Sequence, residues 1–182
     1  QRRQVLGLDE IALGQDDGPL DHVAQLAHVA RPGVGFQAAH RFGVDLALDP
    51  ATIDQAALLH EVREICRPAG ADVVIEVCGV ADVIRLGLDM LRVGGTYVLA
   101  GVVNPQAMVT IDANLLLRKL LTLRGVHNYH PRNLIEALDF VVGNRRRFPF
   151  HDLVDGRYPL DRVGEAMADA AARRVLRAAI VP

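Results

Sequence analysis

The stretch from Ala71 to Gly101 constrains the fold most strongly, because it has the form of one β-α-β unit. Two short, mainly apolar runs, 73–77 and 97–100, are each followed within two residues by a glycine, and a segment long enough for a helix joins them. Two buried strands connected in this way run parallel in one sheet. Doubly wound sheets bind ligands outside the carboxyl ends of their strands, which is where Gly79 and Gly101 fall. The pattern therefore predicts a parallel sheet with a binding edge.

Strands and helices alternate through the rest of the chain after Gly43. This alternation predicts an α/β fold with a Rossmann-like, doubly wound and mainly parallel sheet. Asp54 or Thr52 would cap the first helix, Pro131 would begin a later one, and Gly94 would cap the helix inside the β-α-β unit. The expected strands are 44–48, 72–77, 96–101, 121–125 and 175–181, with further candidates at 108–111 and near Leu153. The expected helices are 54–67, 81–91, 115–119, 131–142 and 160–171.

The first 40 residues break this alternation. Glycines and histidines are scattered among Ala and Leu, no strand stands out, and 22–30 would be helical if it is regular at all. We therefore expect the sheet to be incomplete in its N-terminal part. The predicted division is an anomalous segment over 1–37 and a coenzyme-binding domain with a C-terminal tail over 38–182. A shifted reading frame or a gene junction would explain the change near residue 37.

Composition excludes several classes of function. Hydrophobic residues make up 51% of the chain, aromatic residues only 4%, and Trp is absent, so the core must be aliphatic, as in parallel strands buried on both faces. The formal net charge of -2 gives no electrostatic argument for nucleic acid or an anionic membrane. No apolar run approaches the roughly 18 residues of a membrane span. Cys66 and Cys78 are too few for a disulfide framework, which favours a reducing, cytoplasmic setting.

Five segments in the right order resemble the medium-chain dehydrogenase/reductase family, and specifically the zinc-type alcohol dehydrogenases. The resemblance covers about 145 of the 182 residues, from Ala38 to Pro182. It implies a coenzyme-binding region of the Rossmann type. The segments are Ala39-His-Arg-Phe-Gly43-Val-Asp, Gly70-Ala-Asp-Val-Val-Ile-Glu-Val-Cys-Gly79, Leu91-Arg-Val-Gly-Gly95-Thr-Tyr-Val-Leu-Ala-Gly101, Leu123-Arg-Gly125-Val-His-Asn-Tyr129, and Tyr158-Pro-Leu160 with Glu165-Ala166 and Val175-Leu-Arg177-Ala-Ala-Ile-Val181.

The resemblance implies NAD or NADP as the cofactor and assigns residues to its two halves. The turn at Gly79 would lie near the adenosine half, and the segments at Gly101 and Gly125 near the nicotinamide. Glycines at strand ends let a planar ligand approach the backbone, although each could equally serve a plain turn. Arg177 would pair with a phosphate or, alternatively, form a surface ion pair. The predicted cofactor-binding residues are Val77, Cys78, Gly79, Gly101, Val102, Gly125, Val126, His127, Asn128 and Arg177.

The chain departs from this family in its phosphate-binding fingerprint. A G-x-G-x-x-G motif belongs after the first strand, near Gly7 to Gly14, where the acidic Asp9 and Glu10 would face a pyrophosphate. The segment Gly33-Val-Gly-Phe-Gln-Ala38 matches G-x-G-x-x-A. Because no strand is expected before it, we interpret it as part of a helical region instead.

The zinc ligands of such enzymes lie in a preceding N-terminal domain for which this chain has no room. His22 and His28 fit no defensible zinc site, so we expect no metal ligands and no catalytic residues here. His127 and His130 could relay a proton, although ordinary loop histidines are the simpler interpretation.

Three functions remain open from the sequence. The first is the coenzyme-binding domain of a longer zinc-type alcohol dehydrogenase-like oxidoreductase, which would move hydride between an alcohol or carbonyl and nicotinamide. The chain would then be a fragment without activity of its own. The second is a non-catalytic Rossmann-like module that binds a nucleotide or a partner. The third is a structural or interaction remnant that binds no ligand. The resemblance also implies pairing of subunits through the edge at 109–124, which would give a homo-oligomer. Neither the substrate nor the choice between NAD and NADP follows from the sequence.

Overall fold

The computed structural model describes residues 23–26, 41–48, 53–66, 69–103, 107–172 and 174–182. They belong to two units, which we describe separately. Unit 1 comprises Gln1–His28 and Ile53–Asn128, and unit 2 comprises Val29–Thr52 and Tyr129–Pro182. The predicted boundary at residue 37 lies outside the described residues.

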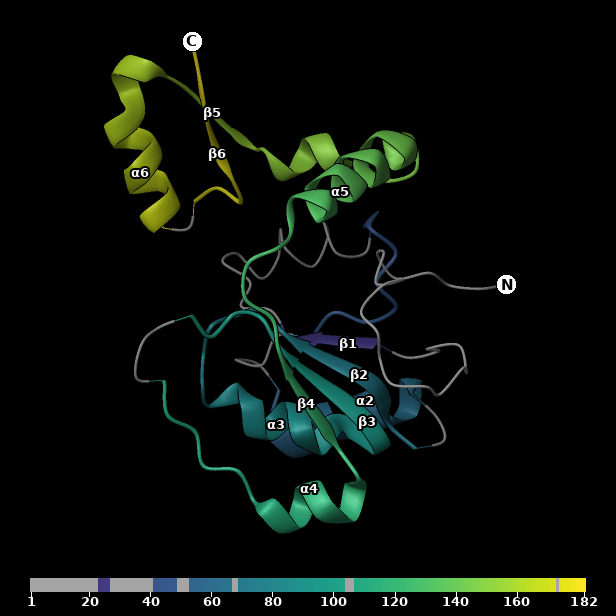
Figure 1. The fold of residues 1–182 in the computed structure, drawn as a ribbon. Helices are drawn as coiled ribbons and strands as arrows, with labels where there is room; N and C mark the ends of the chain where they lie inside the picture. The colour runs from purple at the N-terminus through teal and green to yellow at the C-terminus, as the bar shows by residue number, and fades with distance from the viewer. Residues whose placement is uncertain (1–22, 27–40, 49–52, 67–68, 104–106, 173) are drawn as a thin grey trace. The chain divides into compact units, whose positions relative to one another are not determined.

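Unit 1 contains a four-stranded sheet in the order β1-β2-β3-β4, and every neighbouring pair is parallel (Figure 1). In this register Val73 pairs with Val23 on one side and with Thr96 on the other. All four carboxyl ends therefore meet at one edge, which confirms the predicted parallel sheet. The strands are β1 (Val23–Leu26), β2 (Ala71–Glu76), β3 (Leu91–Leu99) and β4 (Thr122–Gly125).

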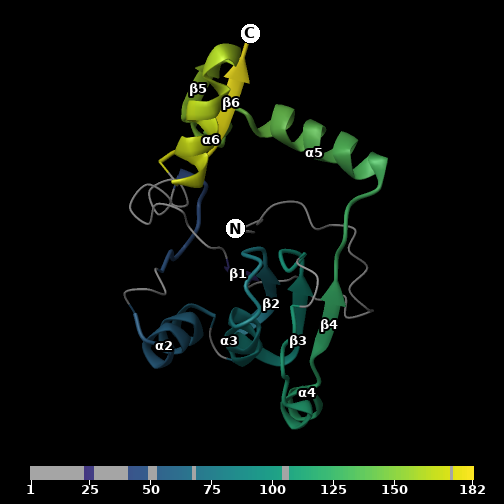
Figure 2. The same cartoon turned by 90° about the vertical axis from the view of Figure 1, so that its left-hand side faces the viewer.

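Strand β2 is the centre of the core. Val73 and Val74 are consecutive in the strand and both buried, so side chains on both faces of β2 are covered. Helix α3 packs on β2 and β3 through Ile84 and Leu88, and helix α2 packs on α3 (Figure 2). The Asp54 carboxylate caps α2 by accepting the Ala57 amide at 2.8 Å, as predicted. The helices of this unit are α2 (Gln55–Ile65), α3 (Val83–Met90) and α4 (Ala113–Lys119).

The end of α3 differs from the expected glycine cap. The helix ends at Met90 and β3 begins at once with Leu91, so Gly94 lies inside the strand. The Lys119 ammonium donates to the carbonyls of Leu88, Asp89 and Leu91 at 3.2, 3.1 and 2.8 Å, which satisfies acceptors that a glycine cap would otherwise serve. The positive φ of Gly94, +77°, instead serves the bulge where the β2–β3 register shifts.

Four other predicted elements are wrong. Residues 44–48 and 108–111 form no strand, because they find no partner among the described strands. The strand expected near Leu153 is a short 3-10 helix. In the N-terminal segment, where a helix was expected over 22–30, Val23–Leu26 instead pairs with β2 as strand β1.

Unit 2 contains a parallel pair, β5 with β6, and helix α6 packs on both strands. The Asp169 carboxylate accepts the Tyr158 hydroxyl at 2.5 Å and pairs with Arg174, which fastens α6 to β5. Pro131 begins α5, as predicted, and His130 caps it. The elements are α5 (Pro131–Asn144), η1 (Phe150–Leu153), β5 (Gly156–Pro159), η2 (Leu160–Arg162), α6 (Val163–Ala171) and β6 (Ala178–Val181). No described helix is both long and apolar enough to cross a membrane.

Candidate functional site

The carboxyl edge of the four-stranded sheet is built from the turns that follow β2, β3 and β4. The Gly101 amide donates to the Glu76 carbonyl at 2.9 Å, and the Val126 amide donates to the Leu99 carbonyl at 2.9 Å. Each turn is therefore tied to the end of a neighbouring strand. This arrangement places three of the predicted segments, at Gly79, Gly101 and Gly125, along one edge.

Two of these glycines are required by close backbone contact. A Cβ on Gly101 would lie 2.5 Å from the Val77 carbonyl carbon and 2.7 Å from the Gly79 nitrogen. A Cβ on Gly79 would lie 2.9 Å from the Gly101 carbonyl oxygen, and the φ of Gly79 is +75°. At Gly125, by contrast, a Cβ would meet nothing within 4 Å. Gly79 and Gly101 thus have structural reasons to be glycine, whereas Gly125 borders open space.

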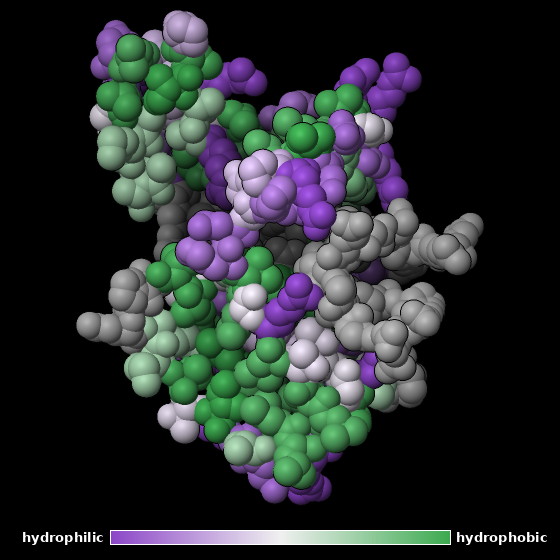
Figure 3. All heavy atoms as spheres, viewed as in Figure 1, coloured by the Kyte–Doolittle hydropathy of each residue, from purple (hydrophilic) through white to green (hydrophobic). Residues whose placement is uncertain are grey.

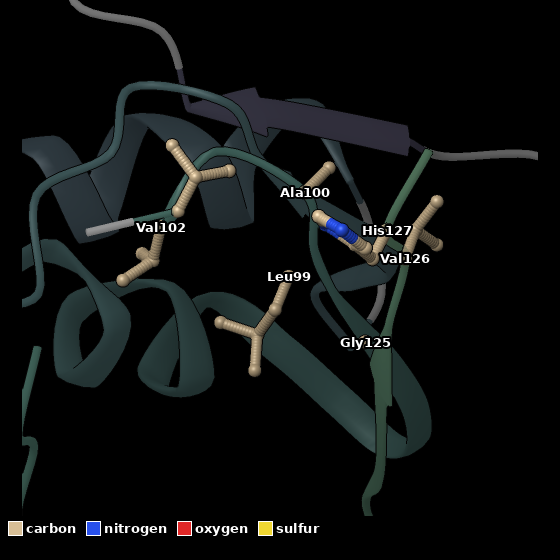
Figure 4. A pocket seen from close by; sticks show the side chains of 7 residues that line it. Leu99, Ala100, Val102, Gly125, Val126 and His127 are labelled. Atoms are coloured by element: carbon tan, nitrogen blue, oxygen red, sulfur yellow. The ribbon is translucent and has the colours of Figure 1, made fainter. Parts of the chain in front are cut away.

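An open pocket of about 550 Å³ lies at the carboxyl ends of β3 and β4 (Figure 4). Apart from His127, the side chains around it are aliphatic, and Gly125 adds none. Four predicted residues line it, together with three that sequence reasoning missed. The lining residues are Leu99, Ala100, Val102, Val103, Gly125, Val126 and His127. The missed residues Leu99, Ala100 and Val103 flank the predicted pair Gly101-Val102, so extending the assignment along the strand end would have found them.

The remaining predicted residues lie outside the pocket lining. Val77, Cys78 and Gly79 form the adjacent turn after β2, and Gly101 contacts that turn through its backbone. Asn128 follows His127 with a φ of +57°, and its amide nitrogen lies 3.1 Å from His127 Nε2.

Arg177 belongs to unit 2, where its guanidinium donates to the Leu176 carbonyl at 2.8 Å. Its role toward a coenzyme stays a prediction.

A charged group lies directly beneath this edge. Glu76, the last residue of β2, is 0% exposed, and its carboxylate accepts the Gly79 amide at 2.6 Å. Burial raises the pKa of the neighbouring Cys78 thiol, and a hydrogen bond to Glu76 raises it further. Burial also raises the pKa of the Tyr97 hydroxyl, so both groups are neutral at physiological pH. Sequence reasoning missed Glu76, although an acidic residue inside the apolar run 73–77 was a visible signal.

The donor set of this edge suits part of a dinucleotide. The pocket has aliphatic side chains around it and no side chain at Gly125, so it can accept a flat ring. The His127 ring, which also lines the pocket, offers a polar contact (Figure 4). The described residues contain no group of three or more His, Cys, Asp or Glu side chains that could hold a metal ion. A zinc ion therefore does not fit this part of the chain.

The two stretches considered for a phosphate loop, Gly7 to Gly14 and Gly33 to Ala38, lie outside the described residues, as do His22 and His28. Strand β1 ends at Leu26, upstream of Gly33. The premise that no strand precedes the G-x-G-x-x-A match is therefore wrong.

Known proteins share this sequence pattern and this fold. Residues 27–143 match the family model described as "Zinc-binding dehydrogenase". The sorbitol dehydrogenase of Halalkalibacterium halodurans is 26% identical over 146 residues, which are 79% of this chain and 41% of that protein.

Two solved structures share the fold. The alcohol dehydrogenase of Thermotoga maritima superposes with a TM-score of 0.76 at 23% identity, over 86% of this chain and 41% of that one. A putative zinc-binding dehydrogenase of Sinorhizobium meliloti bound to NADP gives a TM-score of 0.71 at 21% identity, over 88% of this chain and 44% of that one.

These matches cover similar shares of the relatives. The chain spans about two fifths of the length of the curated relatives that it matches. The matching family model covers more than half of the chain, and the solved neighbours have Rossmann-like domains, as the resemblance implied. The chain belongs to the zinc-binding dehydrogenase family and corresponds to the C-terminal, coenzyme-binding region of its zinc-type alcohol dehydrogenases.

Proposed function

We propose that the carboxyl edge of the β1-β2-β3-β4 sheet binds a nicotinamide dinucleotide. The observation that carries this proposal is the pocket between the ends of β3 and β4, which Val102 and Val126 help to line and where a Cβ on Gly125 would meet nothing within 4 Å. The nicotinamide end lies in this pocket. The adenosine end lies along the turn at Gly79.

The bound cofactor would supply the hydride, and this chain's own residues would position it. The aliphatic side chains of Leu99, Val102 and Val126 exclude water from one face of the ring. His127, which hydrogen-bonds with Asn128, orients a polar group at the rim. In a longer protein that also carries a zinc domain, the edge would serve hydride exchange between a small alcohol and its carbonyl form.

The direct test is a titration of the chain with NADH and, separately, with NADPH, followed by the fluorescence of the reduced nicotinamide. Saturable binding of either coenzyme supports the proposal, and the tighter of the two identifies the cofactor. NAD and NADP are both compatible with the described edge, and the Sinorhizobium meliloti neighbour was solved with NADP. A folded sample that binds neither coenzyme would contradict the proposal and favour a structural or interaction remnant that binds no ligand.

We also propose that two copies of the chain pair through β4. Strand β4 is at the end of the described strand order, so one of its sides lacks a partner among the described strands. Hydrophobic side chains gather on the face of unit 1 that carries β4 and α4 (Figure 3), and Leu117 and Leu120 are 71% and 70% exposed. Light scattering at high concentration should give a dimer mass, and a monomer mass would refute pairing.

The proposed setting is the cytoplasm, in keeping with Cys66 and Cys78 as free thiols.

A further inference from the structure

The buried Glu76 carboxylate is the feature of unit 1 that hydrophobic packing does not explain. Its side chain is 0% exposed at the end of a strand whose other buried residues, such as Val73 and Val74, are aliphatic. Burying a carboxylate costs several kcal/mol unless donors replace its lost water. An aliphatic residue would fill this position without that cost. The hydrogen bonds of the Glu76 carboxylate must therefore be what offsets it.

Glu76 is bonded to the two turns that frame the candidate site. One carboxylate oxygen accepts the Gly79 amide at 2.6 Å, and the other accepts the Gly101 amide at 3.2 Å. The main-chain carbonyl of Glu76 also accepts the amides of Ala100 and Gly101, at 3.0 and 2.9 Å. A single residue therefore links the turn after β2 to the turn after β3.

These bonds decide what the two glycines can offer a ligand. Backbone amides at strand-to-helix turns commonly bind phosphate, but the amides of Gly79 and Gly101 are already used by Glu76. The negative charge of Glu76 would also repel a phosphate placed above them. The two glycines can therefore offer a ligand only close contact with the backbone, at the place where Gly101 lies directly against Val77 and Gly79.

We propose that Glu76 is a positioning residue, whose carboxylate holds the Val77–Gly79 turn against the Ala100–Val102 turn and so fixes the floor of the coenzyme site. This inference rests on the proposed function, because it assigns Glu76 to the coenzyme-binding edge. Glu76 touches no ligand in this account. It acts by binding the two glycine amides. These hydrogen bonds hold the two turns close together and keep the edge flat, so that the uncharged parts of a dinucleotide can lie against it.

Two variants and a control separate positioning from plain packing. Glu76→Met keeps an unbranched side chain and removes both acceptors, whereas Glu76→Gln keeps one acceptor and removes the charge. Asp72→Asn is the matched control, since Asp72 lies at the opposite end of β2 and pairs with Arg92. Each variant, made over residues 1–182, is examined by urea unfolding, amide hydrogen exchange and NADH titration.

Glu76→Met should speed amide exchange at Gly79 by about tenfold or more, because that amide loses a charge-assisted hydrogen bond. Gly101 should change less, because it keeps the Glu76 main-chain carbonyl. The NADH dissociation constant should rise by about tenfold in Glu76→Met and by less in Glu76→Gln. Asp72→Asn should leave both readouts unchanged even where it lowers the urea midpoint.

The outcomes distinguish this inference from the proposed function. Unchanged exchange at Gly79 in a folded Glu76→Met chain would overturn the role of Glu76, and so would unchanged exchange at both Gly79 and Gly101 in Glu76→Gln. So would faster exchange with wild-type NADH affinity. A wild-type chain that binds no NADH would contradict the proposed function, and the exchange rates would then still decide whether Glu76 fixes the two turns.

Discussion

Substitution of Gly101 by alanine tests the geometry of the binding edge. The new Cβ would lie 2.5 to 2.7 Å from three backbone atoms of Val77 and Gly79, where ordinary contacts begin at 3.4 Å. Backbone cannot rotate away as a side chain can, so the turns after β2 and β3 must separate by most of an ångström. That separation also stretches the bond from the Gly79 amide to Glu76.

The expected cost of Gly101→Ala is about 3 kcal/mol, since overpacking alone costs about 1–3 kcal/mol and a strained charge-assisted bond adds to it. With a urea slope of about 2 kcal/mol/M, the unfolding midpoint should fall by about 1.5 M. Far-UV circular dichroism is the assay, because the chain has no Trp for fluorescence.

Gly125→Ala is the matched control, because its Cβ would meet nothing within 4 Å and Gly125 has no positive φ. Its free energy of unfolding should stay within about 0.5 kcal/mol of the wild type or rise slightly, because alanine restricts the unfolded chain. The new methyl group would enter the pocket, so NADH binding should weaken while stability holds. A Gly101→Ala chain as stable as the wild type would refute the close contact between the turns.

Two further predictions concern bonds away from the edge. Lys119→Met should lower the free energy of unfolding by about 2 kcal/mol, because three main-chain carbonyls lose a charged donor. The control Arg118→Met, at the neighbouring exposed residue, should change it little. Urea midpoints of the two variants test this prediction. The Tyr158 hydroxyl, and then Arg174, lower the pKa of Asp169 below its ordinary 3.8. The ionised Asp169 therefore stabilises unit 2 above pH 3.8, and this contribution is lost as the pH falls through the lowered pKa. Asp169→Asn should remove this part of the acid dependence in urea midpoints measured against pH, and an unchanged acid profile would contradict the assignment.

The sequence patterns predicted those elements whose causes are local. Short apolar runs located β2 and β3. The Asp54 side chain caps α2 through an amide within four residues of itself. Gly94 was assigned wrongly because the true partner of the α3 carbonyls, Lys119, is far away in the chain. Strand β1 was missed for a similar reason, since its four residues carry no alternation and are held by pairing with β2.

The candidate site shows the same division between local and long-range causes. The glycines at the strand ends lie along one edge, as expected, because the carboxyl ends of parallel strands meet at one side of a sheet. Val102, Gly125, Val126 and His127 line the pocket, as the predicted segments suggested. An acidic Glu76 inside an apolar run was visible in the sequence, but its partners could not be predicted, because they are two amides from different turns.

Mapping of coenzyme binding by amide chemical shifts tests the central claim most directly. Isotope-labelled chain is titrated with NADH, and each amide is followed to saturation. If the coenzyme binds at the carboxyl edge, we expect saturable chemical-shift changes at Val102 and at Gly125 to His127. Smaller changes are expected at Gly79 and little change at α2. Shifts that gather elsewhere in the chain, or no saturable shift at any concentration, would contradict the assignment of the coenzyme to the carboxyl edge of the sheet.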